Sequence, residues 1–134
     1  MEIVDSKVAN KALNVLVTSF GFKYGLPIES ELVFDVRFLP NPHYVKELAP
    51  LTGQNEKVQK YVLDSEVSKD FHSRMFSFID FLMPQYLKEG KCHLTIAIGC
   101  TGGRHRSVTF AELITKHLRG QGFRVIVDHR DLER

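Results

Sequence analysis

The stretch from residue 94 to residue 118, LTIAIGCTGGRHRSVTFAELITKHL, joins an apolar run to a glycine-rich turn and then to an amphipathic segment. The apolar run at 94–98 predicts a buried strand, and the segment 108–118 predicts a helix. Between them, glycines at 99, 102 and 103 allow backbone N–H groups to turn inward without obstruction by a Cβ atom. A strand, a tight turn and a helix N-terminus in this order favour the binding of an anion.

The side chains of this loop add groups that bind oxyanions. Arg104 and Arg106 carry planar guanidinium groups that can donate two parallel hydrogen bonds to one anion, and Thr101 and Ser107 carry hydroxyl groups. The predicted ligand is therefore a phosphate or a carboxylate group.

The length and composition are those of one globular domain over residues 1–134, with 43% hydrophobic and 25% charged residues. No apolar run approaches the ~20 residues of a membrane span, and the N-terminus lacks the pattern of a signal peptide. We therefore expect a cytoplasmic protein. Residues 90–134 carry eight Lys and Arg against four Asp and Glu, so the positive charge is concentrated around the glycine loop.

Hydrophobic patterning predicts the order β-β-α-α-β-α-β and hence an α/β fold, with a mostly parallel sheet flanked by helices. The expected strands are 14–20, 32–39, 94–98 and 123–127. The expected helices are 55–63, 108–118 and a long one that begins at Ser68 and contains the stripe Phe71, Met75, Phe78, Ile79, Leu82 and Tyr86. Pro84 should kink or end this helix, and residues 1–12 are either a short helix or a frayed lead-in.

Ligands of parallel α/β sheets bind beyond the carboxyl ends of the strands. Candidate groups at this edge, besides the residues Cys100, Thr101, Gly102, Gly103, Arg104, His105, Arg106 and Ser107 of the loop, are Lys23, Asp35, Arg37 and His43. Two alternatives stay open: Lys23 as a solvated turn residue, and Asp35 in an internal ion pair with Arg37 or Arg106.

Several chemistries are compatible with the loop. Cys100 and Arg106 have the C-x5-R spacing of tyrosine-phosphatase-like enzymes, in which a thiolate attacks a phosphorus atom held by the loop and the arginine. Such catalysis also needs a general acid, for which His43, Asp35 and His105 are the candidates. The alternative is simple phosphate binding, with Cys100 as a small buried residue. Basic residues with Phe22 and Tyr24 as stacking rings give some support to nucleic-acid binding.

We expect no metal and no cofactor. The histidines and the two cysteines lack C-x-x-C or H-E-x-x-H spacing, and no G-x-x-x-x-G-K-[ST] motif is present for ATP hydrolysis. Cys92 and Cys100 should not form a disulfide with each other, because they lie at opposite ends of one predicted strand.

Four motifs together resemble the C-terminal domain of the RapZ (YvcJ) family: SFGFKYG at 19–25, FDVRFLPNPHY at 34–44, LTG at 51–53 and IGCTGGRHRSV at 98–108. The resemblance covers about residues 14–130. Full-length members of this family are bacterial cytoplasmic proteins with an N-terminal P-loop half that binds nucleotides, and that half is not part of this sequence. The resemblance implies that any nucleotide binding belongs to that half.

The resemblance also implies a function for the C-terminal half: sensing of glucosamine 6-phosphate, binding of small regulatory RNA, an RNase adaptor role and homo-oligomers. The implied pocket residues are Asp35, Arg37, Asn41, His43, Cys100, Thr101, Gly102, Arg104, His105, Arg106 and Ser107. RNA-binding members end in a strongly basic tail, whereas residues 128–134 contain three carboxylates. The cations left for RNA are Lys116, Arg119, Arg124 and Arg130.

These observations give one leading hypothesis and one alternative. The leading hypothesis is a non-catalytic domain that binds a phosphorylated small molecule, such as an amino sugar phosphate, and couples this binding to RNA or to a protein. The alternative is a cysteine-dependent phosphatase that uses Cys100 and Arg106.

Overall fold

The computed structural model describes residues 12–134, and the order of its elements confirms the predicted α/β arrangement. The strands are β1 (Asn14–Gly21), β2 (Leu32–Asp35), β3 (His93–Cys100) and β4 (Arg124–His129). The helices are α2 (Glu56–Leu63), α3 (Glu66–Glu89) and α4 (Arg106–Gly120), with short 3-10 turns η1 (Phe22–Tyr24) and η2 (Pro42–Tyr44). Apart from position 12, the expectation for residues 1–12 lies outside the described range.

The four strands form one sheet in the order β2-β3-β1-β4, and every pairing between neighbours is parallel. The register places Gly21 opposite Cys100 and Asp35 opposite Gly99. The carboxyl ends of β1, β2 and β3 therefore meet at one edge of the sheet, where the loop after β3 begins.

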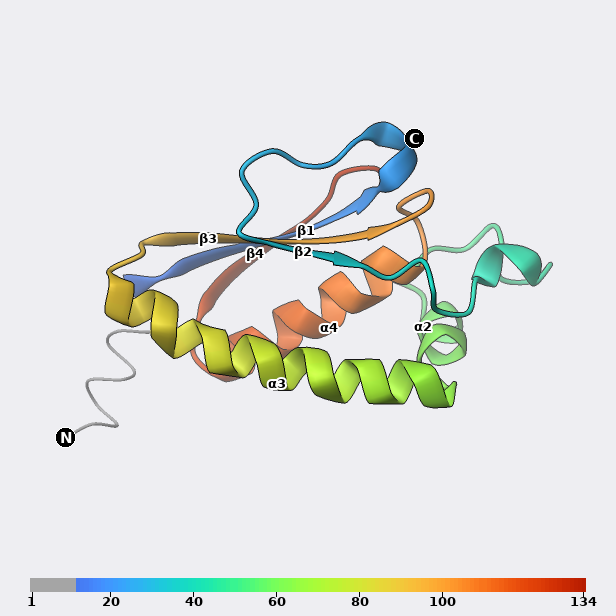
Figure 1. Cartoon of the computed structure of the whole chain (residues 1–134). Coiled ribbons are helices and arrows are strands. Elements are labelled where there is room, and N and C mark those ends of the chain that lie inside the picture. Colours follow the sequence, from blue (N-terminus) through green and yellow to red (C-terminus); the bar gives the residue numbers. More distant parts are fainter. Residues whose placement is uncertain (1–11) are drawn as a thin grey trace.

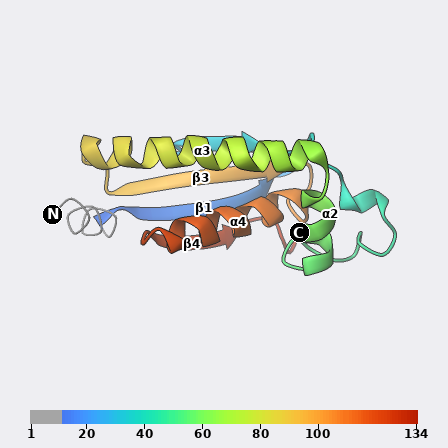
Figure 2. The same cartoon turned by 90° about the horizontal axis from the view of Figure 1, so that it is seen from below.

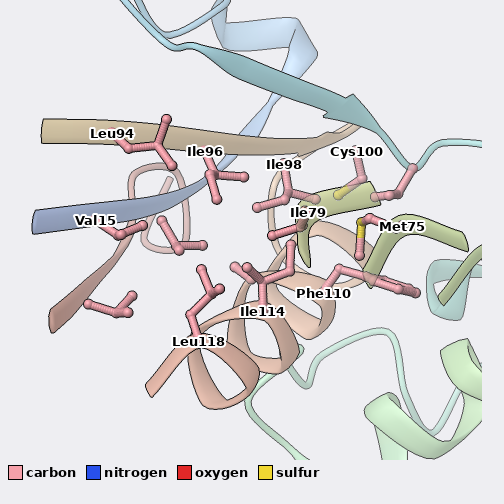
Figure 3. Packing of buried hydrophobic residues seen from close by; sticks show 14 of the residues in the cluster. Val15, Met75, Ile79, Leu94, Ile96, Ile98, Cys100, Phe110, Ile114 and Leu118 are labelled. Atoms are coloured by element: carbon pink, nitrogen blue, oxygen red, sulfur yellow. The ribbon is translucent and has the colours of Figure 1, made fainter. Parts of the chain in front are cut away.

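Helices α3 and α4 cover one face of this sheet, and the loop at 25–31 passes over the other (Figure 1 and Figure 2). The side chains between the sheet and the helices form the core (Figure 3), which includes Val15, Leu94, Ile96, Ile98, Met75, Ile79, Phe110, Ile114 and Leu118. Burial of these apolar side chains is the main force that holds the helices on the sheet.

The outer face of the sheet is more open than the apolar strand patterns predict. Leu16 on β1, Val33 on β2 and Ile126 on β4 point away from the helices and are exposed, Ile126 to 71%. The predicted buried strand at 14–20 is thus buried on one face more fully than on the other.

The second strand is shorter than the predicted 32–39, because the chain turns after Asp35. The N–H group of Val36 still donates to the carbonyl of Gly99 (2.9 Å), but Leu39 then donates to Val36 (3.3 Å) and closes a turn. The last predicted strand is longer than expected and runs from Arg124 to His129.

The prediction that Ser68 begins the long helix is wrong. Ser65 is the N-cap and accepts a hydrogen bond from the N–H group of Ser68, whose buried hydroxyl donates to the carbonyl of Val62. Pro84 does not end the helix, which continues to Glu89 and stops at Gly90 in a left-handed conformation (φ 90°).

Part of the predicted apolar stripe of this helix is exposed instead of buried. Met75 and Ile79 are buried as predicted, Met83 is buried as well, and Phe78 is half exposed. Within residues 12–134, no helix has both the length and the apolar character that crossing a membrane requires.

Replacing Ile114 on α4 by alanine should lower the free energy of unfolding by about 2–5 kcal/mol, because it leaves a cavity in the core. Ile126→Ala removes the same atoms from an exposed position and should change stability by less than about 0.5 kcal/mol. Urea unfolding followed by circular dichroism measures both values, and equal losses for the two variants would contradict the assignment of the two faces.

Candidate functional site

A cleft of about 430 Å³ lies at the carboxyl edge of the sheet, between the loop after β3 and the turns after β1 and β2. It is lined by Lys23, Asn41, His43, Tyr44, Ala49, Cys100, Thr101, Gly102, Arg104, His105 and Arg106. A more open hollow of about 520 Å³ lies along α3, but its lining holds one lysine and one aspartate instead of several cations. The cleft beside the loop is therefore the better candidate for an anion site.

Arg106 is the first residue of α4, and only 5% of it is exposed. Its Nη1 atom donates to the carbonyl oxygens of Arg37 (2.6 Å) and Leu39 (3.3 Å), which fixes one corner of the guanidinium group to the turn after β2. Nη2 lies 3.4 Å from the hydroxyl of Thr101, and Nε is buried without a hydrogen-bond partner among residues 12–134.

The Nε and Nη2 atoms form the edge of an arginine that can bind two oxygens of one anion side by side. In this structure that edge makes only the 3.4 Å contact from Nη2 to Thr101, whereas Nη1 at the opposite corner donates two hydrogen bonds. A buried donor without a partner is costly, and Arg106 is one of the residues that line the cleft.

Arg104 and His105 are held in place by backbone carbonyls. Arg104 donates from Nη1 to Leu132 (3.0 Å) and from Nη2 to Pro50 (3.4 Å). His105 is buried, and its Nε2 lies 3.1 Å from the carbonyl of Ala49. Burial lowers the pKa of His105, with smaller contributions from the charges of Arg104 and His43, and the hydrogen bonds to backbone carbonyls oppose this shift. His105 is consequently neutral at pH 7 and donates its Nε2 proton.

Cys100 ends β3 and continues the buried row formed by Ile96 and Ile98 (Figure 3). Its sulfur atom lies 3.1 Å from the hydroxyl of the buried Ser107, within hydrogen-bonding distance. Cys100 is thus both part of the core and part of the lining of the cleft, and its thiol is free of any disulfide.

The turns after β1 and β2 bring Lys23, Asn41 and His43 to the cleft. The N–H group of Lys23 donates to the carbonyl of Thr101 (3.3 Å), so the η1 turn is tied to the loop. The side chain of Asn41 accepts from the N–H group of His43 (3.0 Å) and caps the η2 turn. These bonds position the turn, while the ring of His43 remains exposed at the rim.

Asp35 and Arg37 form an ion pair with each other, with two hydrogen bonds of 3.0 and 2.7 Å between their side chains. The hydrogen bond from Arg37 lowers the pKa of Asp35, and the charge of Arg106 adds to this effect. The guanidinium of Arg37 also lies over the ring of Phe22, 3.9 Å from its centre. The two side chains therefore have partners outside the lining of the cleft, and Arg37 supports Arg106 through its carbonyl group.

Two glycines pack backbone against backbone beneath the loop. A Cβ atom on Gly21 would come within 2.5 Å of the carbonyl carbon of Gly102, and one on Gly103 within 2.7 Å of the nitrogen of Gly21. Gly103 also has a φ of 81°, a conformation that other residues adopt rarely. Gly103 shapes the loop from below, whereas Gly102 lines the cleft.

The structure thus brings together most of the predicted ligand-binding residues, while Asp35, Arg37, Gly103 and Ser107 lie outside the lining of the cleft. Sequence reasoning missed Tyr44 and Ala49, which do line it. Tyr44 directly follows His43 in a motif already singled out, but its 83% exposure could not be read from the sequence.

Sequence reasoning also missed Asp131, a fully buried carboxylate. It accepts hydrogen bonds from the N–H group of Gly21 (2.7 Å) and from the side chains of Arg130 (2.8 Å) and Arg134 (2.9 Å). Burial alone would raise the pKa of Asp131, but these hydrogen bonds and the two arginine charges outweigh burial and hold this pKa below its usual value.

The four cations predicted for RNA differ in their surroundings. Arg119 donates two hydrogen bonds to the carbonyl of Val125, and Arg130 bonds to Asp131 and to the carbonyl of Gly25. Lys116 and Arg124 are exposed. In the part of the chain that the structure describes, no cluster of three metal-ligating side chains is found.

The fold and the cleft define a class: a parallel α/β domain with a cleft, lined by Arg104 and Arg106, between the end of a strand and the start of a helix. A family model for the RapZ C-terminal domain matches residues 13–133. The chain belongs to this family, which confirms the resemblance seen in the four motifs.

Several curated relatives are named nucleotide-binding proteins. One from Clostridioides difficile strain 630 is 51% identical over 130 residues, which are 97% of this chain and 46% of the relative. One from Halothermothrix orenii is 49% identical over 127 residues, covering 95% of this chain and 45% of the relative. One from Clostridium perfringens is 52% identical over 128 residues, covering 96% and 44%. The chain therefore spans less than half the length of these relatives.

The lowered pKa of Asp131 leads to a prediction for stability in acid. Because its pKa is lower in the folded than in the unfolded state, ionised Asp131 stabilises the fold above about pH 4, and this contribution is lost as the pH falls through the folded pKa. Asp131→Asn should cost about 1–3 kcal/mol at pH 7 and progressively less below pH 4. Urea unfolding from pH 2.5 to pH 7 measures this difference, and a difference that stays constant with pH would contradict the assigned charge.

Proposed function

We propose that this domain binds the phosphate group of a phosphorylated small molecule in the cleft and acts as a non-catalytic sensor. The observation that carries the proposal is the buried guanidinium of Arg106, whose Nε atom lacks a hydrogen-bond partner among residues 12–134. Phosphate offers several acceptor oxygens to the Nε and Nη2 edge, and its charge would compensate that of the buried arginine.

Other features of the cleft support phosphate over a neutral ligand. His105, the N-cap residue of α4, makes no side-chain capping bond, and Arg106, the first residue of this helix, lines the cleft, so the positive end of the helix dipole adds to the attraction for an anion. Lys23 and Arg104 line the same space and add positive charge. A volume of about 430 Å³ lies in the range of small-molecule sites and exceeds the needs of inorganic phosphate alone.

The ring of Tyr44 supports a ligand with a second part beyond the phosphate. It stands at the rim and lies edge-on to the ring of His43, with 5.7 Å between the ring centres. An exposed aromatic ring of this kind can pack against a sugar ring. Family membership makes glucosamine 6-phosphate the first ligand to test.

Membership in the family also supports a macromolecular partner. We propose that binding of the small molecule changes how the domain binds RNA or a protein such as an RNase. We further infer that the nucleotide binding for which these relatives are named belongs to the part of those proteins that this chain does not match. A cytoplasmic, homo-oligomeric bacterial regulator is part of the same proposal. Light scattering tests the oligomer, and loss of RNA affinity with rising salt tests the RNA contact.

Replacing Arg106 by lysine should weaken the binding of both glucosamine 6-phosphate and inorganic phosphate at least about tenfold, because lysine cannot present a two-donor edge. Isothermal titration calorimetry measures both affinities. Arg124→Lys changes an exposed arginine at the start of β4 in the same way and should bind like the wild type. Absence of binding by the wild type, or equal binding by the Arg106 variant, would contradict the proposal.

Tyr44→Ala separates the two parts of the ligand. This variant should bind glucosamine 6-phosphate more weakly than the wild type does, because the sugar part of this ligand reaches the rim. Its affinity for inorganic phosphate should be unchanged, because inorganic phosphate does not reach the rim.

A cysteine-dependent phosphatase is the second candidate, and the contact between Cys100 and Ser107 favours it, since a hydroxyl at 3.1 Å can donate to a thiolate. Our proposal of a sensor predicts no turnover of an aryl phosphate between pH 5 and pH 8. Turnover that is lost in Cys100→Ser but retained in Cys92→Ser would replace the sensor by the phosphatase.

A further inference from the structure

Side-chain contacts between β1 and the last residues of the chain begin at the end of the β1–β4 pairing and extend two residues beyond it. We call residues 128–134 the C-terminal segment. Successive residues of β1 contact successive residues of this segment: Thr18 with Asp128 (3.2 Å), Ser19 with His129 (2.7 Å), the ring of Phe20 with the guanidinium of Arg130 (5.6 Å) and the N–H group of Gly21 with Asp131 (2.7 Å). The segment is thus attached to β1 through side chains at four consecutive positions.

Asp131 is the most buried of these contacts. Its carboxylate satisfies the N–H group of Gly21 at the end of β1 and is itself held by Arg130 and Arg134. The guanidinium of Arg134 also lies 4.7 Å from the ring centre of Tyr24 in η1. One carboxylate therefore joins the strand end to the final turn of the chain.

The loop of the cleft rests on this junction. The Cβ atom that a side chain would place on Gly103 would lie 2.7 Å from the nitrogen of Gly21 and 3.0 Å from the Cβ atom of Asp131. The turn at Gly102–Gly103 accordingly packs directly against Gly21 and Asp131. Gly102 in turn lines the cleft.

A second connection runs through Arg104, which lines the cleft and donates to the carbonyl of Leu132 (3.0 Å). The C-terminal segment therefore supports two groups of the anion site, the backbone at Gly102 and the guanidinium of Arg104. Displacement of the segment would move both groups, and displacements of about 1 Å can weaken recognition strongly.

We propose that Asp131 is a positioning residue for the phosphate cleft and that docking of the C-terminal segment and binding of phosphate favour each other. This inference rests on the proposed function, since it presupposes that the cleft binds phosphate. Linkage is reciprocal: if the docked segment raises the affinity for phosphate, bound phosphate stabilises the docked segment to the same extent.

The test compares Asp131→Ala and Asp131→Asn with the control Glu133→Gln, which neutralises an exposed carboxylate of the same segment. Calorimetric titration with inorganic phosphate is done at a temperature at which every variant is folded. The dissociation constant should rise about tenfold or more for Asp131→Ala, less for Asp131→Asn, and remain unchanged for Glu133→Gln.

If Asp131 has a purely structural role, the Asp131→Ala variant will have a lower melting temperature but the same affinity for phosphate as the wild type. This result would overturn the inference but not the proposed function. Absence of phosphate binding by the wild type would overturn the proposed function and the inference together.

Amide hydrogen exchange in the wild type tests the same linkage without a variant. The N–H groups of Leu132 and Arg134 close the final turn of the segment by bonds to His129 and Asp131, and their exchange should slow on addition of phosphate. The N–H group of Gly90, at the other end of the sheet, serves as the control and should exchange at an unchanged rate. Equal rates at Leu132 and Arg134 with and without phosphate would overturn the linkage.

Discussion

The buried guanidinium of Arg106 is the constraint around which the site is arranged. A charge removed from water needs hydrogen-bond partners, and the carbonyl groups of Arg37 and Leu39 supply them at one corner. These carbonyls are available because the chain turns after β2 instead of continuing as a strand. The early end of β2, the ion pair of Asp35 with Arg37 and the position of Arg106 are therefore parts of one arrangement.

The backbone beneath the loop imposes a second constraint. Gly21 and Gly103 approach each other so closely that neither position has room for a Cβ atom. This approach brings the end of β1 into contact with the loop after β3, so the cleft is formed by the sheet edge itself. The positions of its groups are then set by strands and by tied turns, which hold a site more rigidly than long free loops do.

Much of this could be predicted from the sequence, because it depends on local patterns. The apolar runs predicted the order of strands and helices, and the glycines and arginines of residues 99–107 predicted the edge of the sheet at which the cleft lies. Partners distant in sequence could not be predicted in this way. Whether Asp35 faces a ligand or Arg37 depends on where the chain turns, and the burial of Asp131 depends on a strand 110 positions earlier. The N-cap at Ser65 could not be told from Ser68 by sequence, because both are serines three residues apart. Only the structure shows that Ser65 accepts from the N–H group of Ser68, while the hydroxyl of Ser68 donates to Val62.

The pairing of β1 with β4 has a consequence for how the domain folds. It joins segments near the two ends of the described chain, so it closes a long loop, and contacts of this kind form slowly. A folding intermediate that has β1, β3 and α4 in place already contains Arg106 and the glycine loop, but not the junction at Asp131. If the cleft binds phosphate as proposed, with an affinity that depends on Asp131, capture of phosphate during refolding would report that the two ends of the domain have met.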